Sequence, residues 1–150
     1  MSGPHLNSGK QVQEYVYSFA DDGGAISTIA LSSKANVDPL PLGAVVTEVV
    51  LKVITAFTSG GSATLSWGNS DGVTTYSGTA VPVASLVANA CFNGMGNGAS
   101  VLWNDTEDAA VPFPVINAAD AAVNVSIAAA AMTAGKAVIM VEYFHHAASA

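Results

Sequence analysis

Two glycine-rich segments match motifs that perform chemistry in other proteins. Residues 68–72, Gly-Asn-Ser-Asp-Gly, match the nucleophile elbow, which needs a strand before the serine and a helix after it. Residues 94–99, Gly-Met-Gly-Asn-Gly-Ala, match the dinucleotide fingerprint, which must open a helix whose N-terminus holds the pyrophosphate. The residues after each motif, Val-Thr-Thr-Tyr and Ser-Val-Leu-Trp, favour strands instead. We therefore interpret the first motif as a hairpin turn and the second as a loop.

The candidates for metal binding are few and scattered. Residues 104–108, Asn-Asp-Thr-Glu-Asp, could offer oxygens to Ca²⁺, but they lack the spacing and central glycine of an EF-hand, so we favour a solvated loop. His145 and His146 are adjacent on an expected tail, and His5 stands alone. Cys91 has no base nearby in the sequence and is interpreted as a small core residue. Because catalysis needs several converging groups, we predict no enzymatic activity, no cofactor and no metal.

The composition narrows the classes of partner. The chain has 150 residues, of which 51% are hydrophobic and only 10% charged, with four lysines, no arginine, eleven acidic residues and a net charge of −7. A chain without a dense basic face is a poor binder of nucleic acid or of an anionic membrane surface. One cysteine excludes a disulfide framework. We see neither a signal peptide nor an apolar run of about 20 residues that could span a bilayer, so we expect a soluble protein made in a cytoplasm.

The strongest structural signal is the segment of residues 44–57. It is packed with β-branched residues, which favour a strand over a helix, and it is apolar on both faces. We therefore expect a strand that is central in its sheet or lies under another subunit. Its inward side chains are expected to be Val45, Val49, Leu51, Val53 and Phe57, and its outward ones include Val46, Glu48, Val50, Lys52 and Ile54.

Other segments alternate in the same way. Residues 13–19 and 25–31, separated by Asp-Asp-Gly-Gly, predict an N-terminal hairpin. Residues 133–136, Thr-Ala-Gly-Lys, predict a turn before a closing strand at residues 137–144. Pro82 assigns residues 79–87 to an edge strand or an extended loop.

The number and spacing of these segments predict the fold class. About eight to ten short strands with regular turns are typical of an antiparallel sandwich or barrel. We predict an all-β chain with a single antiparallel β-sandwich, of jelly-roll type, at residues 14–150. Residues 1–13, rich in Pro, Gly, Asn and Ser at their start, are expected to form an extended N-terminal arm that orders on binding a partner.

Three stretches of the sequence resemble a known class of virion protein. Residues 47–57, Thr-Glu-Val-Val-Leu-Lys-Val-Ile-Thr-Ala-Phe, followed by Ser-Gly-Gly and by residues 63–69, Ala-Thr-Leu-Ser-Trp-Gly-Asn, are similar to the central hairpin of small β-sandwich proteins on tailed-bacteriophage virions. Residues 133–143, Thr-Ala-Gly-Lys-Ala-Val-Ile-Met-Val-Glu-Tyr, resemble their closing strand. The family of capsid decoration (cement) proteins has this form, commonly as trimers with a jelly-roll core.

The resemblance implies a structural role on the capsid exterior. The expected partner is the major capsid protein, bound by a homotrimer that bridges capsid subunits, and neither nucleic acid nor membrane is expected to bind. We expect the N-terminal arm to contact the capsid through Pro4, His5, Leu6 and Asn7.

Two alternatives remain open. One is a receptor- or glycan-binding module of a tail or head fibre, for which Trp67, Tyr76 and Trp103 could supply stacking surfaces, although core burial is favoured for them. The other is a cupin-like metal protein, which would need clustered ligands, whereas the three histidines lie at the two ends of the chain.

Overall fold

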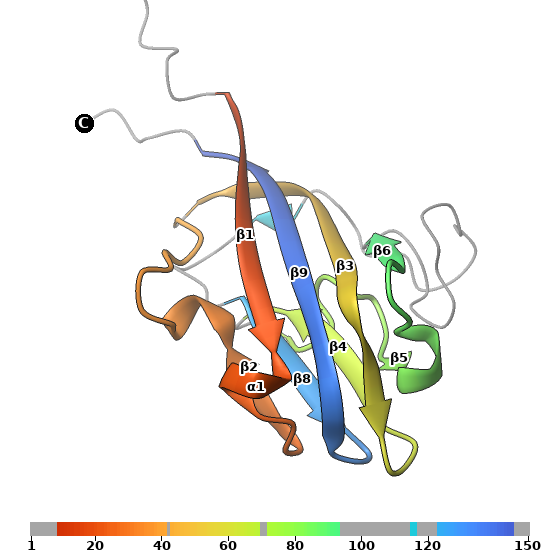
Figure 1. Ribbon diagram of the computed structural model, residues 1–150. Helices are drawn as coiled ribbons and strands as arrows, with labels where there is room; N and C mark the ends of the chain where they lie inside the picture. Colours follow the sequence, from red (N-terminus) through yellow and green to blue (C-terminus); the bar gives the residue numbers. More distant parts are fainter. Residues whose placement is uncertain (1–8, 42, 70–71, 94–114, 117–122, 146–150) are drawn as a thin grey trace, which may run out of the picture.

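Two antiparallel sheets pack face to face in this chain (Figure 1). The computed structural model describes residues 9–41, 43–69, 72–93, 115–116 and 123–145. The front sheet has the order β1 (Lys10–Ser18), β9 (Met132–Phe144), β3 (Val45–Ser59) and β6 (Cys91–Asn93), and β7 (Val115–Ile116) also pairs with β3. The back sheet has the order β2 (Ser27–Ala30), β8 (Asn124–Ala128), β4 (Thr64–Gly68) and β5 (Val81–Pro82). The short helix α1 (Phe19–Asp22) follows β1, and the 3₁₀ turns η2 (Leu31–Ser33) and η3 (Val83–Ser85) follow β2 and β5.

The chain crosses repeatedly between the two sheets. Strands β1, β3 and β6 lie in front, β2, β4, β5 and β8 lie behind, and β9 returns to the front between β1 and β3. The pair of orders β1-β9-β3-β6 and β2-β8-β4-β5 is that of an eight-stranded jelly roll. The predicted all-β antiparallel sandwich of jelly-roll type is therefore confirmed. So is the edge position predicted for the Pro82 segment, because β5 is the last strand of the back sheet.

The predicted N-terminal hairpin is wrong. Strand β1 pairs with β9 and strand β2 pairs with β8, so the two lie in different sheets. The Asp-Asp-Gly-Gly signal marks a real reversal, but it takes the form of helix α1 and a crossover rather than a tight β-turn. Asp22 anchors this crossover, because its Oδ2 accepts hydrogen bonds from the Ser18 backbone N–H at 2.8 Å and from Lys34 Nζ at 2.7 Å.

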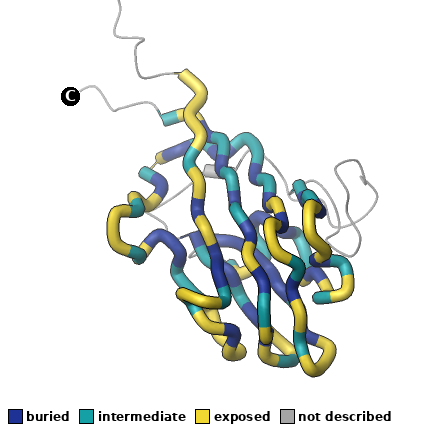
Figure 2. The backbone as a smooth tube through the Cα atoms, in the orientation of Figure 1, coloured by how far each residue is buried: buried dark blue, intermediate teal, exposed yellow. Residues whose placement is uncertain are grey.

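The core lies between the sheets and is built from the inward half of each strand (Figure 2). The inward residues of the main strands are fully or almost fully buried: Tyr15 and Tyr17 of β1, Val49, Leu51 and Val53 of β3, Leu65 and Trp67 of β4, Val125 and Ile127 of β8, and Ile139 and Val141 of β9. The Trp67 ring meets Phe92 edge-on across the sandwich at 6.0 Å. Burial raises the pKa of Tyr17 to about 12, which keeps its hydroxyl neutral as a donor to the Gly23 carbonyl.

The start of β3 departs from the predicted alternation. Val46 is buried and Val45 is only half-buried, the reverse of the expectation, whereas Val49, Leu51, Val53 and Phe57 face inward as predicted. The pairing with β9 shifts register between Val46 and Glu48, and such an irregularity moves one residue to the other face of the sheet. The predicted central position of the strand is confirmed, since β3 pairs with β9 on one edge and with β6 and β7 on the other.

Strand β9 begins earlier than the sequence predicts. Residues 133–136, expected as a turn, already belong to β9, and the chain reverses just before them, where Ala129 has a φ of 67°. Gly135 sits in this strand with a φ of 139° against the ring of Phe57. Phe57 in turn stacks on Tyr17 at 5.6 Å between ring centroids. The lack of a side chain at Gly135 thus leaves room for the stacked rings of Phe57 and Tyr17 to pack against β9.

We expect Gly135→Ala to lower the free energy of unfolding by about 2–4 kcal/mol, measured by denaturant unfolding. A Cβ there would lie 2.4 Å from Phe57 Cδ1, at a backbone angle that side chains rarely adopt. Gly60→Ala is the matched control, because a Cβ at Gly60 meets no atom within 4 Å, and it should change stability by less than about 0.5 kcal/mol. Equal effects of the two substitutions would contradict this account of Gly135.

Candidate functional site

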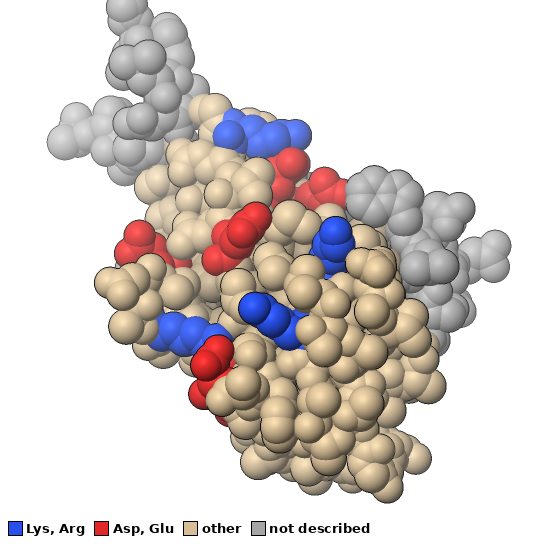
Figure 3. Space-filling model, viewed as in Figure 1, with Lys and Arg blue, Asp and Glu red and all other residues tan. Residues whose placement is uncertain are grey.

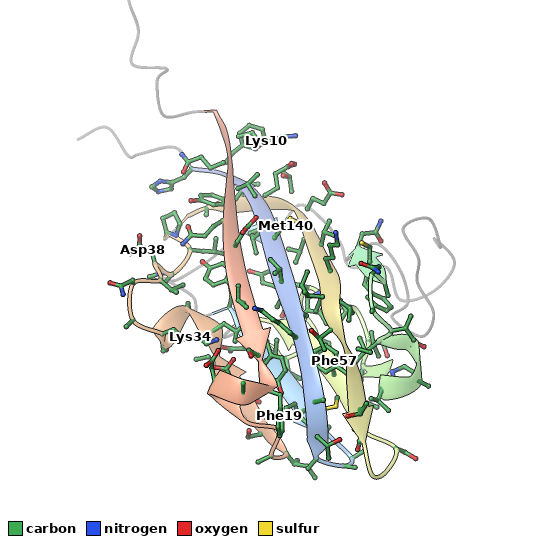
Figure 4. All side chains as sticks on the ribbon, viewed as in Figure 1. Lys10, Phe19, Lys34, Asp38, Phe57 and Met140 are labelled. Atoms are coloured by element: carbon green, nitrogen blue, oxygen red, sulfur yellow. The ribbon has the colours of Figure 1, made fainter. Side chains whose placement is uncertain are left out.

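The outward side chains of β1, β9 and β3 form one continuous surface, named here the outer face. The Cα register sets them in rows across the strands. The rows are Val12, Glu142 and Glu48, then Glu14, Met140 and Val50, then Val16, Val138 and Lys52, with Lys136 and Ile54 beyond the third row and Lys10 beyond the first. Figure 4 labels Lys10 and Met140 on this side of the sheet.

The middle of the outer face is apolar although it faces solvent. Val12 is 60% exposed, Ile54 44% and Val16 37%. Met140, Val50 and Val138 beside them are half-buried. A shallow groove of about 160 Å³ opens at the first two rows, lined by Val12, Glu48, Val50, Met140 and Glu142. A group of exposed apolar side chains on one face is typical of an interaction surface.

One carboxylate of the outer face is held by partners. Glu142 Oε1 lies 3.0 Å from Lys10 Nζ and accepts a hydrogen bond from the Thr47 hydroxyl at 3.0 Å. The bond from Lys10 is the largest cause that holds the pKa of Glu142 below its usual range, partial burial opposes it, and Thr47 adds to it. Glu48 stands beside Glu142 on the neighbouring strand, where like charges repel, so the Lys10 ammonium also relieves a repulsion within the sheet.

Apart from Lys10, which lies at the acidic end, the charges of the outer face are sorted along the strands (Figure 3). Glu48 and Glu142 lie in the first row and Glu14 in the second, whereas Lys52 lies in the third row and Lys136 beyond it. The described part of the chain holds two ion pairs, Lys10–Glu142 and Lys34–Asp22. Neither pair uses the carboxylate of Glu48 or the ammonium groups of Lys52 and Lys136.

The exposed apolar side chains make the outer face suited to binding. Its polar groups are carboxylates and ammonium groups spread over three strands, together with the Thr47 hydroxyl that donates to Glu142. Within the described residues, no cluster of three or more His, Cys, Asp or Glu could hold a metal ion. The same part of the chain contains no helix that is long and apolar enough to cross a membrane.

The capsid-contacting residues predicted from the sequence lie outside the described residues. This applies to Pro4, His5, Leu6 and Asn7. The predicted arm at residues 1–13 overlaps strand β1, since residues 10–13 pair with residues 141–144 of β9. The described start of the chain therefore enters the front sheet four residues before the predicted sandwich boundary.

The serine motif is a hairpin turn, as predicted. Asn69 and Gly72 form a bridge in which each backbone N–H donates to the other residue's carbonyl, at 3.2 and 3.3 Å. Turns rather than the expected strand follow at residues 73–77, where the Tyr76 and Ser77 N–H groups both donate to the Trp67 carbonyl. The glycine motif at residues 94–99 and the acidic cluster at residues 104–108 lie outside the described residues.

The aromatic and sulfur-containing candidates have structural positions. Trp67 and Tyr76 are fully buried, so the predicted core role is confirmed for both, while Trp103 lies outside the described residues. Cys91 is half-buried opposite Lys52 on β6, so its interpretation as a core residue is wrong. Its neighbour Phe92 takes the inward position instead. His145 is half-buried just after β9, and His146 is not described.

The sequence reasoning missed the outer face as a site. The sequence analysis did recognise that residues 44–57 are apolar on both sides of the strand. Apolar residues on the outward side indicate a second surface that another molecule or element could cover. The alignment of these residues with β1 and β9 requires a register between segments about 90 residues apart in the chain, and no local pattern encodes it.

Comparisons with known proteins identify the fold. No protein-family model matches the chain, and no curated protein matches it in sequence. A chain of the acidic stable capsid structure of Helicobacter pylori bacteriophage KHP30 is similar in structure, with a TM-score of 0.57, 16% identity and coverage of 93% of this chain and 90% of that one. A chain of the capsid of Ralstonia phage GP4 has a TM-score of 0.55, 18% identity and coverage of 99% and 91%. At these identities the likeness establishes a shared fold over nearly the whole chain.

We expect Lys10→Gln to raise the pKa of Glu142, measured by NMR titration of its carboxyl carbon. Because the folded-state pKa lies below the ordinary value of 4.5, ionised Glu142 stabilises the fold above that pH, and this stability is lost as pH falls through the lowered pKa. Lys10→Gln should therefore flatten the fall in stability below pH 4.5, by no more than about 1 kcal/mol for so exposed a pair. Lys52→Gln is the control and should leave Glu142 unchanged; an equal shift in both variants would contradict the assignment.

Proposed function

We propose that this chain is a structural protein of a bacteriophage capsid, which binds the outside of the shell and stabilises it by bridging neighbouring capsid subunits. The carrying observation is that its jelly roll aligns over more than nine tenths of its length with chains of two phage capsid structures. The match spans nine tenths of those chains as well, so the likeness concerns a domain of the same extent rather than a fragment.

The physical properties of the chain suit this role. A bridging protein stabilises a shell through buried contact area and needs no reacting groups. The partner proposed here is the major capsid protein. We propose a homotrimer, since a closed threefold assembly matches the threefold and quasi-threefold positions of an icosahedral shell.

The place where the chain enters the sandwich supports a tethering arm. Lys10 of β1 pairs with Phe144 of β9, so the described chain enters and leaves the front sheet at the same end (Figure 1). A segment that precedes β1 can therefore contact a shell at this end without disturbing the core. We propose that residues 1–8, including Pro4, His5, Leu6 and Asn7, make this contact.

The alternative of a glycan-binding module is weakened by the positions of the aromatic residues. Two of its three candidate stacking residues, Trp67 and Tyr76, are fully buried and cannot stack on a sugar without unfolding the core. Binding of glycans or host cells by the isolated protein would restore this alternative.

The test of the proposed function is co-sedimentation with expanded shells assembled from the major capsid protein of the phage that encodes the chain. The full chain should sediment with these shells, and a variant lacking residues 1–8 should stay in the supernatant. Its melting temperature should be unchanged, because the front sheet begins at Lys10. A variant lacking residues 146–150 is the matched control and should still bind.

The two parts of the proposal fail separately. A full chain that does not sediment with the shells overturns the decoration role. A truncated chain that binds as well as the full one overturns the arm but leaves the decoration role standing. Light scattering of the free protein tests the trimer, which requires a mass of at least three times 15.0 kDa.

A further inference from the structure

The outer face carries opposite net charges at its two ends, with apolar side chains between them. At the acidic end, Lys10 offsets one of the three glutamates. Along β9 the outward residues are, in order, Glu142, Met140, Val138 and Lys136. Along β3, which runs antiparallel to β9, Glu48 lies beside Glu142, and Lys52 lies beside Val138. Both strands therefore place acid at one end of the face and base at the other.

The order of charges along the strands makes the outer face complementary to a second outer face whose strands run in the opposite direction. If a second copy lies on the face with its strands in the opposite direction, the acidic end of each copy covers the basic end of the other. The same copy laid in the same direction would place carboxylates on carboxylates. A twofold axis that lies in the plane of contact and is perpendicular to the strands generates the favourable arrangement, in which the same patch serves on both copies.

The dimensions permit such contacts. Outward residues on one strand are spaced by about 6.6 Å, twice the rise of about 3.3 Å per residue, so Glu142 and Lys136 are about 20 Å apart along the strand. Stacked sheets lie about 10 Å apart, a gap that lysine and glutamate side chains can bridge together. Met140, Val138 and Val50 would then meet in the middle, away from water.

The distribution of lysine supports a second copy as the occupant. The chain has only four lysines and no arginine, yet Lys10, Lys52 and Lys136 all belong to the outer face. In the described part of the chain, neither Lys52, Lys136 nor Glu48 takes part in an ion pair within the protein. A face that concentrates scarce cations next to carboxylates, with exposed valines between them, matches a partner with the same pattern.

We propose that a second copy of this chain docks on the outer face, front sheet against front sheet, with its strands reversed. This contact is independent of the shell and of any threefold contact, which would use other surfaces of the molecule. Where both contacts form, the twofold contact joins two trimers. It explains why residues 44–57 are apolar on both sides of the strand.

The test uses two charge reversals that should each block self-association but complement one another. Glu48→Lys leaves two glutamates and two lysines at the acidic end, so that end loses its net charge. Lys52→Glu removes the net charge of the basic end in the same way, because Lys136 remains there. Each variant alone should have half the mass of the wild-type protein in light scattering at equal concentration. An equimolar mixture of the two should recover the wild-type mass, because the lysine introduced at position 48 of one copy then faces the glutamate introduced at position 52 of the other.

Controls separate the contact from effects on folding or net charge. Asp38→Lys changes the net charge by the same amount as Glu48→Lys but lies in the loop after η2, where the Asp38 carbonyl accepts hydrogen bonds from the inward-facing Gln13 and Tyr15, and it should keep the wild-type mass. Melting curves should show that both reversal variants are folded. The double variant Glu48→Lys with Lys52→Glu again sets a lysine against a glutamate across the two copies and should associate more strongly than either single variant.

Three results would overturn the proposal. A wild-type protein that has the mass of its reversal variants at every concentration has no twofold contact. Variants that dissociate but do not recover when mixed show that the charges do not face each other across copies. A threefold rather than twofold drop in mass would assign the outer face to the trimer contact instead. None of these readings involves shell binding, so they are independent of the capsid role.

Discussion

The antiparallel pairing of β3 with β9 is the constraint on which the rest of the structure depends. These are the two longest strands, and their pairing extends from Val45 opposite Phe144 to Ser59 opposite Met132. Each remaining strand of the front sheet pairs with one of them, β1 with β9 and β6 and β7 with β3. Their inward side chains supply the front half of the core, and their outward ones supply most of the outer face. Because side chains alternate along a strand, the same pairing positions both surfaces at once.

This dual use explains the irregularities of β3. A pairing this long between twisted strands cannot keep one register, and it shifts after Val46 and again around Thr55 and Thr58. The first shift buries Val46 in place of Val45 and starts the outer face at Glu48. The later shifts lie where Phe57 covers Gly135, so the aromatic ring fills the space above a residue that has no side chain. The register shifts of β3 thus decide which of its residues face the core and which belong to the outer face.

Local alternation predicted the strands well but not their partners. The inward residues of β4 and β8, such as Leu65 and Val125, follow directly from a period of two. The turn closed by Asn69 and Gly72 was predicted from its residue types instead. The N-terminal hairpin failed because alternation tells which side of a strand is buried and not which strand lies beside it. In a jelly roll, neighbours in sequence mostly belong to opposite sheets, so local turn signals suggest the wrong pairs. The outer face was hidden for the same reason, since its rows combine residues 12–16, 48–54 and 136–142.

Because the chain has few charged residues, the position of each one is informative. One ion pair, Lys34 with Asp22, is mostly shielded from solvent and fastens the crossover between the sheets, so it has a structural role that accounts for it. The pair of Lys10 with Glu142 is exposed and lies at the rim of the groove, where it contributes little stability. Fold stability therefore does not explain why a chain with so few lysines carries three of them on one sheet face. Recognition does explain it, because charges at the rim of an apolar contact contribute more to orientation and partner choice than to affinity. The proposed docking of a second copy in a single direction needs that orientation, and the apolar residues between the charges supply the buried area.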